Sequence, residues 1–239
     1  MFLRDTTQWS QLLLLFALVL VYLYNFRVLD LDRLPYVSGL IKNVYAFVNL
    51  GMAAFVLSTV AVRFVFPAVS VEGPAFWLLR TSPVSMRAFL WCKFWAGLVP
   101  VLLLAEMLTI VSNELLRVDP FLKILSATAI LFMSFALVGL AAGMGAQHPR
   151  FSFENITQVS GSYGGIAFMI AAVLFILLQI GLLGWSSSIY LWYRYHHMAL
   201  PAWQLAKMGV CFAVALALSG ATFWLPMRRG VQALEQMGG

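Results

Sequence analysis

Residues 124–147 read ILSATAILFMSFALVGLAAGMGAQ, and this run decides the fold because it contains no Asp, Glu, Lys or Arg. A helix that crosses a hydrocarbon core about 30 Å thick needs about 20 predominantly apolar residues, and this run is long enough. A lipid-facing strand would instead alternate apolar and polar residues, whereas the run is continuously apolar. The sequence therefore predicts a transmembrane helix here.

The composition of the whole chain also indicates a membrane protein. Of its 239 residues, 62% are hydrophobic and 10% are charged, and the mean hydropathy is +0.90. Soluble domains carry about 25% charged residues, so these few charged side chains cannot cover a surface that faces water. The net charge of +6 favours contact with anionic lipid headgroups over nucleic acid. The two cysteines, both in apolar sequence, imply no disulfide framework.

Charge-poor runs recur along the chain and predict an all-α polytopic membrane protein, with six transmembrane helices in a single domain covering residues 1–239. The first run is too long for the apolar region of a signal peptide, about 7–15 residues, and no small-residue cleavage site follows it. We therefore expect a retained helix there. The expected spans are residues 8–26, 43–63, 94–112, 124–146, 164–184 and 208–227.

The Lys and Arg residues near the ends of the spans set the expected orientation. Residues 63–93, between the second and third spans, contain four basic residues and one acidic residue, which favours the cytoplasmic side. Over the whole chain, however, the basic residues divide almost evenly, with eight on the side of this loop and seven on the other. We therefore expect both termini in the cytoplasm, with the chain in a bacterial plasma (inner) membrane.

The loop between the second and third spans reads RFVFPAVSVEGPAFWLLRTSPVSMRAFLWCK (residues 63–93). Gly73-Pro74 puts a proline where the first turn of a helix needs no N–H donor, which predicts a short helix over residues 74–81. Ser82-Pro83 repeats the pattern, with Ser82 as N-cap of a helix that continues through Lys93 into the third span. The short helix cannot span a membrane, so it either lies at the interface or docks against a protein.

Four stretches give the chain a resemblance to a known family: RDTTQWSQ (Arg4–Gln11), RFVFPAVSVEGPAFWLLRTSP (Arg63–Pro83), KFW (Lys93–Trp95) and ENITQVSGSYGG (Glu154–Gly165). With these stretches the chain resembles the ABC-2-type transporter permeases, in particular an ABC exporter family with long permease chains. Members of that family often carry a preceding six-span half. The resemblance leaves two arrangements open, a half-size subunit and the C-terminal half of a longer permease.

The resemblance implies that the short helix is a coupling helix, which sits in a cleft of an ATP-binding subunit. On this basis Glu72 and Arg80 would pair with charges of the ATPase, and Phe76 and Trp77 would fill its apolar groove. Gly73 is counted with them as a coupling residue.

The resemblance also implies short re-entrant helices before the last span. The candidate is Trp185–Tyr195, and the alternative is that this aromatic segment simply anchors the chain at the headgroups.

Polar side chains within the expected spans are candidates for a translocation path. Glu106 lies near the middle of the third span, where a carboxylate is costly unless it faces the bundle or water. Asn49 and Gln179 are further candidates. For each of them the alternative is a hydrogen bond to a neighbouring helix.

Two Gly-x-x-x-Gly pairs indicate places where helices approach closely, because glycine has no side chain to separate them. Gly139 and Gly143 form the first pair, and Gly161 and Gly165 form the second. Each pair fits either packing within the bundle or an interface between subunits.

No motif in the sequence supplies an enzymatic site. The chain has no Gly-Lys dipeptide and so no phosphate-binding loop, and it has neither an HExxH nor a GxSxG motif. The adjacent His196 and His197 point to different faces of a helix, which makes them a poor pair of ligands for one metal. His148 and His196 fall on opposite sides of the expected topology, which disfavours their joint ligation of a haem.

The resemblance thus leads us to expect the transmembrane permease subunit of an ABC exporter, which couples ATP hydrolysis by a separate subunit to substrate translocation. The chain would not itself be an enzyme and would need no cofactor. Its expected partners are an ATP-binding subunit, a second permease half and membrane lipids, without nucleic acid. Two alternatives remain, a non-transporting membrane scaffold subunit and a membrane-embedded, haem-binding redox subunit.

Overall fold

The computed structural model describes residues 39–81, 83–152, 155–196, 198 and 201–237, with three isolated positions at Ala17, Leu20 and Tyr24. In these residues the chain is helical and forms no strand. Five helices are long: α2 (Gly39–Phe64), α4 (Met86–Leu115), α5 (Pro120–Gln147), α7 (Tyr163–Tyr195) and α8 (Ala202–Gln236). Four elements are short: η3 (Phe66–Ala68), η4 (Ser70–Ala75), α3 (Phe76–Thr81) and α6 (Ile156–Ser160).

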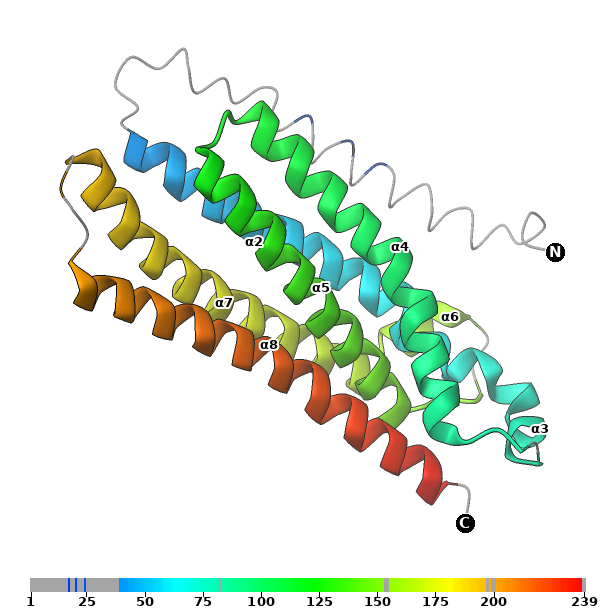
Figure 1. Cartoon of the computed structure of the whole chain (residues 1–239). Coiled ribbons are helices and arrows are strands. Elements are labelled where there is room, and N and C mark those ends of the chain that lie inside the picture. The colour runs from blue at the N-terminus through cyan, green and yellow to red at the C-terminus, as the bar shows by residue number, and fades with distance from the viewer. Residues whose placement is uncertain are drawn as a thin grey trace.

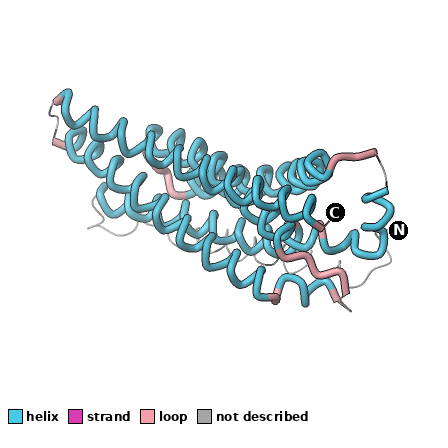
Figure 2. The backbone as a smooth tube through the Cα atoms, turned by 90° about the horizontal axis from the view of Figure 1, so that it is seen from below, coloured by secondary structure: helices cyan, strands magenta, loops and turns pink. Residues whose placement is uncertain are grey.

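The five long helices are long and apolar enough to cross a membrane, and they lie side by side along one axis (Figures 1 and 2). They coincide with five of the expected spans and extend beyond them, as α8 does over 35 residues. At 1.5 Å per residue such a helix is about 50 Å long, so its ends extend past a hydrocarbon core of about 30 Å. The expected span over residues 8–26 lies outside the described residues, apart from three positions.

Successive long helices run in opposite directions, so the segments that connect them lie at the two ends of the bundle. We call one the α3 end: it holds η3, η4, α3, α6 and the last residues of α8 (Figure 1). The opposite end holds the connections from α4 to α5 and from α7 to α8.

Helix α5 lies at the centre, in contact with α2, α4, α7 and α8. Its closest neighbour is α8, since a Cβ atom added to Gly143 would lie 2.3 Å from the carbonyl carbon of Pro226. A Cβ atom on Gly139 would lie 2.4 Å from the ring of Phe223, and one on Gly230 would lie 2.8 Å from the carbonyl oxygen of Gly143. The Gly139–Gly143 pair therefore packs within the bundle. The second pair is local, because Gly165 packs against the backbone of Ser160, 2.0 Å from its added Cβ.

The expected re-entrant helix is wrong. Helix α7 continues from Tyr163 to Tyr195, so Trp185–Tyr195 forms its last three turns. The polar run Ser186–Ser188 does not break the helix, because each hydroxyl donates a hydrogen bond to a carbonyl oxygen one turn earlier, on Leu183 or Gly184.

The expected start of the helix that leads into the third span is also wrong. Helix α4 begins at Met86, and its N-cap is Ser85, whose hydroxyl oxygen accepts a hydrogen bond from the N–H of Ala88 at 3.3 Å. Pro83 precedes the helix, and Ser82 lies outside the described residues. Both serines have the chemistry of an N-cap, and only the backbone geometry selects Ser85, whose ψ of 141° is extended.

A short helix lies where the Gly-Pro pattern places it, although its start differs. Gly73 and Pro74 belong to the 3-10 helix η4, and the α-helix α3 begins two residues later, at Phe76.

Candidate functional site

The candidate site is the segment Ser70–Thr81, which comprises η4 and α3 and is called here the α3 segment. The chain that leads into it is fixed by a close contact between two backbones. Phe66 of η3 is fully buried, and a Cβ atom on Gly145 of α5 would lie 2.2 Å from the carbonyl oxygen of Phe66. Since a carbonyl oxygen cannot move aside as a side chain can, only glycine fits at position 145 without displacing η3.

The α3 segment packs against the connection between α5 and α6. Phe76 is buried and stacks on Phe151, with 4.9 Å between the ring centroids. The backbone N–H of Arg150 donates to the hydroxyl oxygen of Ser70 at 3.1 Å. A Cβ atom on Gly73 would lie 3.0 Å from the carbonyl oxygen of Phe151, so glycine permits this approach. The α3 segment is therefore attached to residues about eighty positions later in the chain.

A second attachment joins the α3 segment to α4. The ammonium of Lys93 donates a hydrogen bond to the carboxylate of Glu72 in a partly exposed ion pair. The same ammonium lies 5.6 Å from the centroid of the Phe89 ring, on the preceding turn of α4. This ion pair joins the α3 segment to the first turns of α4.

Two described apolar side chains of the α3 segment are exposed. Leu78 is 57% exposed and Val71 is 46% exposed, and Leu78 belongs to α3, which is too short to cross a membrane. In Figure 1, α3 projects from the end of the bundle. Exposed leucine and valine side chains at this place form a surface that a partner protein can cover.

The five residues predicted to contact an ATPase fall into two groups. Glu72, Gly73 and Phe76 are engaged inside the chain, with Lys93, the Phe151 backbone and the Phe151 ring. Trp77 and Arg80 belong to α3, and their side chains lie outside the described part of the structure.

Sequence reasoning missed two residues at this site. Phe151 gave no signal, because it follows the turn after α5 and its partner Phe76 is far away in the sequence. Leu78 could have been found, since it is part of the apolar FWLL run of the short helix.

The two ends of the bundle differ in charge. Among the described side chains, the α3 end carries the basic residues Arg63, Arg87, Lys93, Arg150, Arg228 and Arg229 against the acids Glu72 and Glu235. The opposite end carries Arg117, Lys123, Arg194 and Lys207 against Glu114 and Asp119. The basic surplus is therefore larger at the α3 end.

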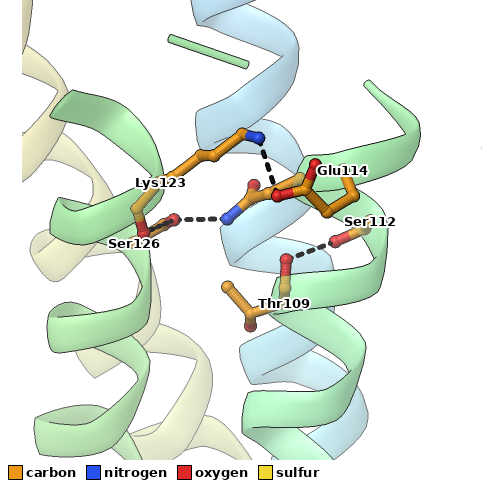
Figure 3. A network of polar contacts seen from close by, with 6 residues as sticks. Thr109, Ser112, Glu114, Lys123 and Ser126 are labelled. Atoms are coloured by element: carbon orange, nitrogen blue, oxygen red, sulfur yellow. Dashed lines mark hydrogen bonds and ion pairs between the residues drawn. The ribbon is translucent and has the colours of Figure 1, made fainter. Parts of the chain in front are cut away.

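A second group of polar residues joins the helices near the opposite end (Figure 3). The amide of Asn49 on α2 donates to the hydroxyl of Ser112 on α4 at 2.7 Å. The amide of Asn113 donates to Ser126 on α5 at 2.6 Å, and Lys123 donates to Glu114 at 2.7 Å. These bonds tie α4 to α2 and to α5.

The structure does not bring the three candidates for a translocation path together. Asn49, 1% exposed, bonds across the α2–α4 contact, whereas Gln179, 2% exposed, donates to the carbonyl of Ala215 and the hydroxyl of Ser219 on α8. Glu106 is half-buried on α4 and has no hydrogen-bond or ion-pair partner within the described ranges.

The positions of two histidines decide whether they could ligate one haem, as the redox alternative would require. His148 follows α5 at the α3 end, and His196 follows α7 at the opposite end, so the two cannot ligate one haem. Within the described residues, no group of three or more His, Cys, Asp or Glu side chains could hold a metal ion.

The fold and composition define an all-helical membrane protein. The chain belongs to the family described as "Putative ATP-binding cassette", whose model matches residues 1–238. No curated protein and no solved structure gives a significant match. The family places the protein in an ABC system, and its description names the ATP-binding cassette without a permease.

Proposed function

We propose that this chain is the transmembrane permease subunit of an ABC exporter of the ABC-2 type. The observation that carries the proposal is the α3 segment, an exposed short helix attached to the ends of several membrane-length helices. The family match supports a role in an ABC system. The chain lacks the Gly-Lys dipeptide of a phosphate-binding loop, and its described residues lack the strand that precedes such a loop. ATP hydrolysis is therefore assigned to a separate subunit.

In this proposal the α3 segment is the coupling helix. It is joined to α2 through η3, to α4 through the Glu72–Lys93 ion pair, and to the α5–α6 connection through the Phe76–Phe151 stack. A force on α3 would therefore reach α2, α4 and α5 together. Glu72, Gly73 and Phe76 hold the helix in place, and Trp77, Arg80 and the exposed Leu78 contact the ATPase.

Alternating access follows as a rigid-body movement of packed helices driven by closure of the ATPase. A second permease half, either a second copy or a partner chain, completes the translocation path. Glu106 faces that path in the proposal, since a half-buried carboxylate at a membrane depth needs water or a partner. Asn49 and Gln179 hold neighbouring helices together instead.

The proposed membrane is the bacterial plasma (inner) membrane, with the α3 end and both termini in the cytoplasm. The larger basic surplus at the α3 end supports this orientation. A chain with Cys92 and Cys211 replaced by serine and a single cysteine at Leu78 tests it. We expect Leu78→Cys to react with a membrane-impermeant maleimide only in inside-out vesicles. The matched Leu115→Cys, exposed at the opposite end, should react only in right-side-out vesicles. The reverse pattern would contradict the proposed orientation.

Coupling is tested on the permease reconstituted with the ATP-binding subunit that co-purifies with it. Leu78→Asp and Trp77→Asp should abolish the permease-dependent part of ATP hydrolysis, because they put a charge into the apolar docking surface. Leu115→Asp places the same charge at the opposite end and should leave this activity unchanged. If all three variants keep full coupling, or if no ATPase co-purifies, the chain is better described as a scaffold subunit.

A further inference from the structure

A groove of about 270 Å³ lies between the first turns of α4 and the last turns of α8, at the α3 end. Its wall on α4 includes Arg87 and Trp91, and its wall on α8 includes Trp224, Arg228 and Glu235. None of these residues belongs to the α3 segment or to the polar group at the opposite end, so the groove is separate from the site described above.

The groove has a charged mouth and an aromatic floor. On α4, Arg87 precedes Trp91 by four residues, and α4 leads away from the α3 end. On α8, Trp224 precedes Arg228 by four residues, and α8 leads toward the α3 end. Because the two helices run in opposite directions, both arginines lie about one turn, or 5.4 Å, nearer the α3 end than both tryptophans.

The positive charge at the mouth is not neutralised within the described residues. Arg87 and Arg228 are exposed, and neither forms an ion pair there. The first turn of α4 contains no acidic residue, so the free N–H groups of the helix start add to the positive potential. Glu235 lies about two turns beyond Arg228 and lowers the charge of the lining residues to one net positive charge.

The aromatic floor is only partly covered by the protein. Trp91 is held by edge-on contacts with Phe94 and Phe223, with centroids 5.7 and 5.9 Å away. Trp224 is 52% exposed. Tryptophan is enriched where the apolar region of a bilayer meets the headgroups, because its ring is apolar and its N–H needs a polar partner.

We propose that this groove binds the headgroup of an anionic phospholipid. The phosphodiester lies between the guanidinium groups of Arg87 and Arg228, which can each form two parallel hydrogen bonds to it. The glycerol and the first acyl carbons lie against Trp91 and Trp224, one turn deeper. One negative charge matches the net positive charge of the lining, and Glu235 accepts a hydrogen bond from a headgroup hydroxyl. This site does not depend on the exporter proposal, because it uses neither α3 nor an ATPase.

Native mass spectrometry of the full chain, released from detergent with phosphatidylglycerol or phosphatidylcholine, measures the binding. We expect one tightly held phosphatidylglycerol, with phosphatidylcholine held at least about tenfold more weakly. The double variant Arg87→Gln/Arg228→Gln should lose at least about tenfold of the phosphatidylglycerol affinity, as expected for losing charge-assisted hydrogen bonds. Arg229→Gln is the matched control, because Arg229 is exposed beside Arg228 and does not line the groove.

Three outcomes would overturn the inference. The first is equal affinity for the two lipids, and the second is equal loss in the double variant and in Arg229→Gln. The third is displacement of the lipid by millimolar inorganic phosphate, which would show a site for a free anion. If the glutamine pair does not fold, Arg87→Lys/Arg228→Lys is measured in its place: weaker binding supports the site, since lysine keeps the charge without the paired hydrogen bonds, and unchanged binding refutes it.

Discussion

Polar side-chain bonds occur at both ends of the bundle, but the α3 end also has close contacts between backbones. At the α3 end, backbones touch through glycine, as Gly145 does with Phe66 and Gly73 with Phe151. At the opposite end the contacts are polar side-chain bonds, such as Asn113–Ser126 and Lys123–Glu114. Backbone contacts permit little adjustment, whereas side chains can change rotamer. The α3 end should therefore move as one body, and the opposite end should tolerate rearrangement.

The largest effect should come from Gly145→Ala. Its Cβ atom would lie 2.2 Å from the carbonyl oxygen of Phe66, so either η3 or α5 must shift. We expect a loss of about 3 kcal/mol in the free energy of unfolding, at the upper end for an overpacked site. Thermal unfolding in detergent, followed by the loss of the folded peak in size-exclusion chromatography, measures it. Gly181→Ala is the control, because nothing lies within 4 Å of its added Cβ. Equal melting curves for the two variants would refute the backbone contact.

Phe76→Ala should have the next largest effect, about 2 kcal/mol. Truncation of a buried phenylalanine costs about 3–5 kcal/mol, but Phe76 belongs to a six-residue helix that can settle into the space left by its ring. Hydrogen exchange should also increase over the α3 segment and leave α7 unchanged. Leu78→Ala, on the same helix and 57% exposed, should change stability by less than about 0.5 kcal/mol. If both variants behave alike, the α3 segment is not attached through Phe76.

At the opposite end, Asn113→Ala should cost about 0.6 kcal/mol, the average for hydrogen bonds between membrane helices. The variant removes the hydrogen bond from Asn113 to Ser126 and leaves the Ser126 hydroxyl buried without this partner. The same chromatographic melting assay detects it, with Ser126→Ala expected to give a similar loss because it removes the other partner. A loss as large as that of Gly145→Ala would erase the contrast between the two ends.

The smallest effect should come from Lys123→Met. Its ion pair with Glu114 is 2.7 Å long, but the carboxylate side chain is 66% exposed. Exposed ion pairs contribute between about 0 and 1 kcal/mol and weaken in salt, so we expect less than about 0.5 kcal/mol at low salt and no difference at 1 M salt. A salt-independent loss would mean that Lys123 stabilises the bundle by packing rather than by charge.

The membrane-length helices could be predicted from the sequence because lipid leaves few choices. A chain segment in hydrocarbon must satisfy its own N–H and C=O groups, so a long apolar run such as residues 124–147 becomes a helix. The Gly139–Gly143 pair likewise predicted a close helix contact, although not its partner. The re-entrant helix before the last span was expected from the family resemblance, and it is wrong because α7 continues unbroken to Tyr195.

The sequence by itself determined the class of protein, five of the membrane-length helices and the place of the short helix between two of them. Only the tertiary structure decided that Leu78 of that helix stays exposed and that Phe76 stacks on Phe151. It also decided that Asn49 and Gln179 form hydrogen bonds with different neighbouring helices. The physical reason is range: hydropathy and capping act over one or two turns of chain, whereas these contacts join residues that are tens of positions apart and meet only when the helices pack.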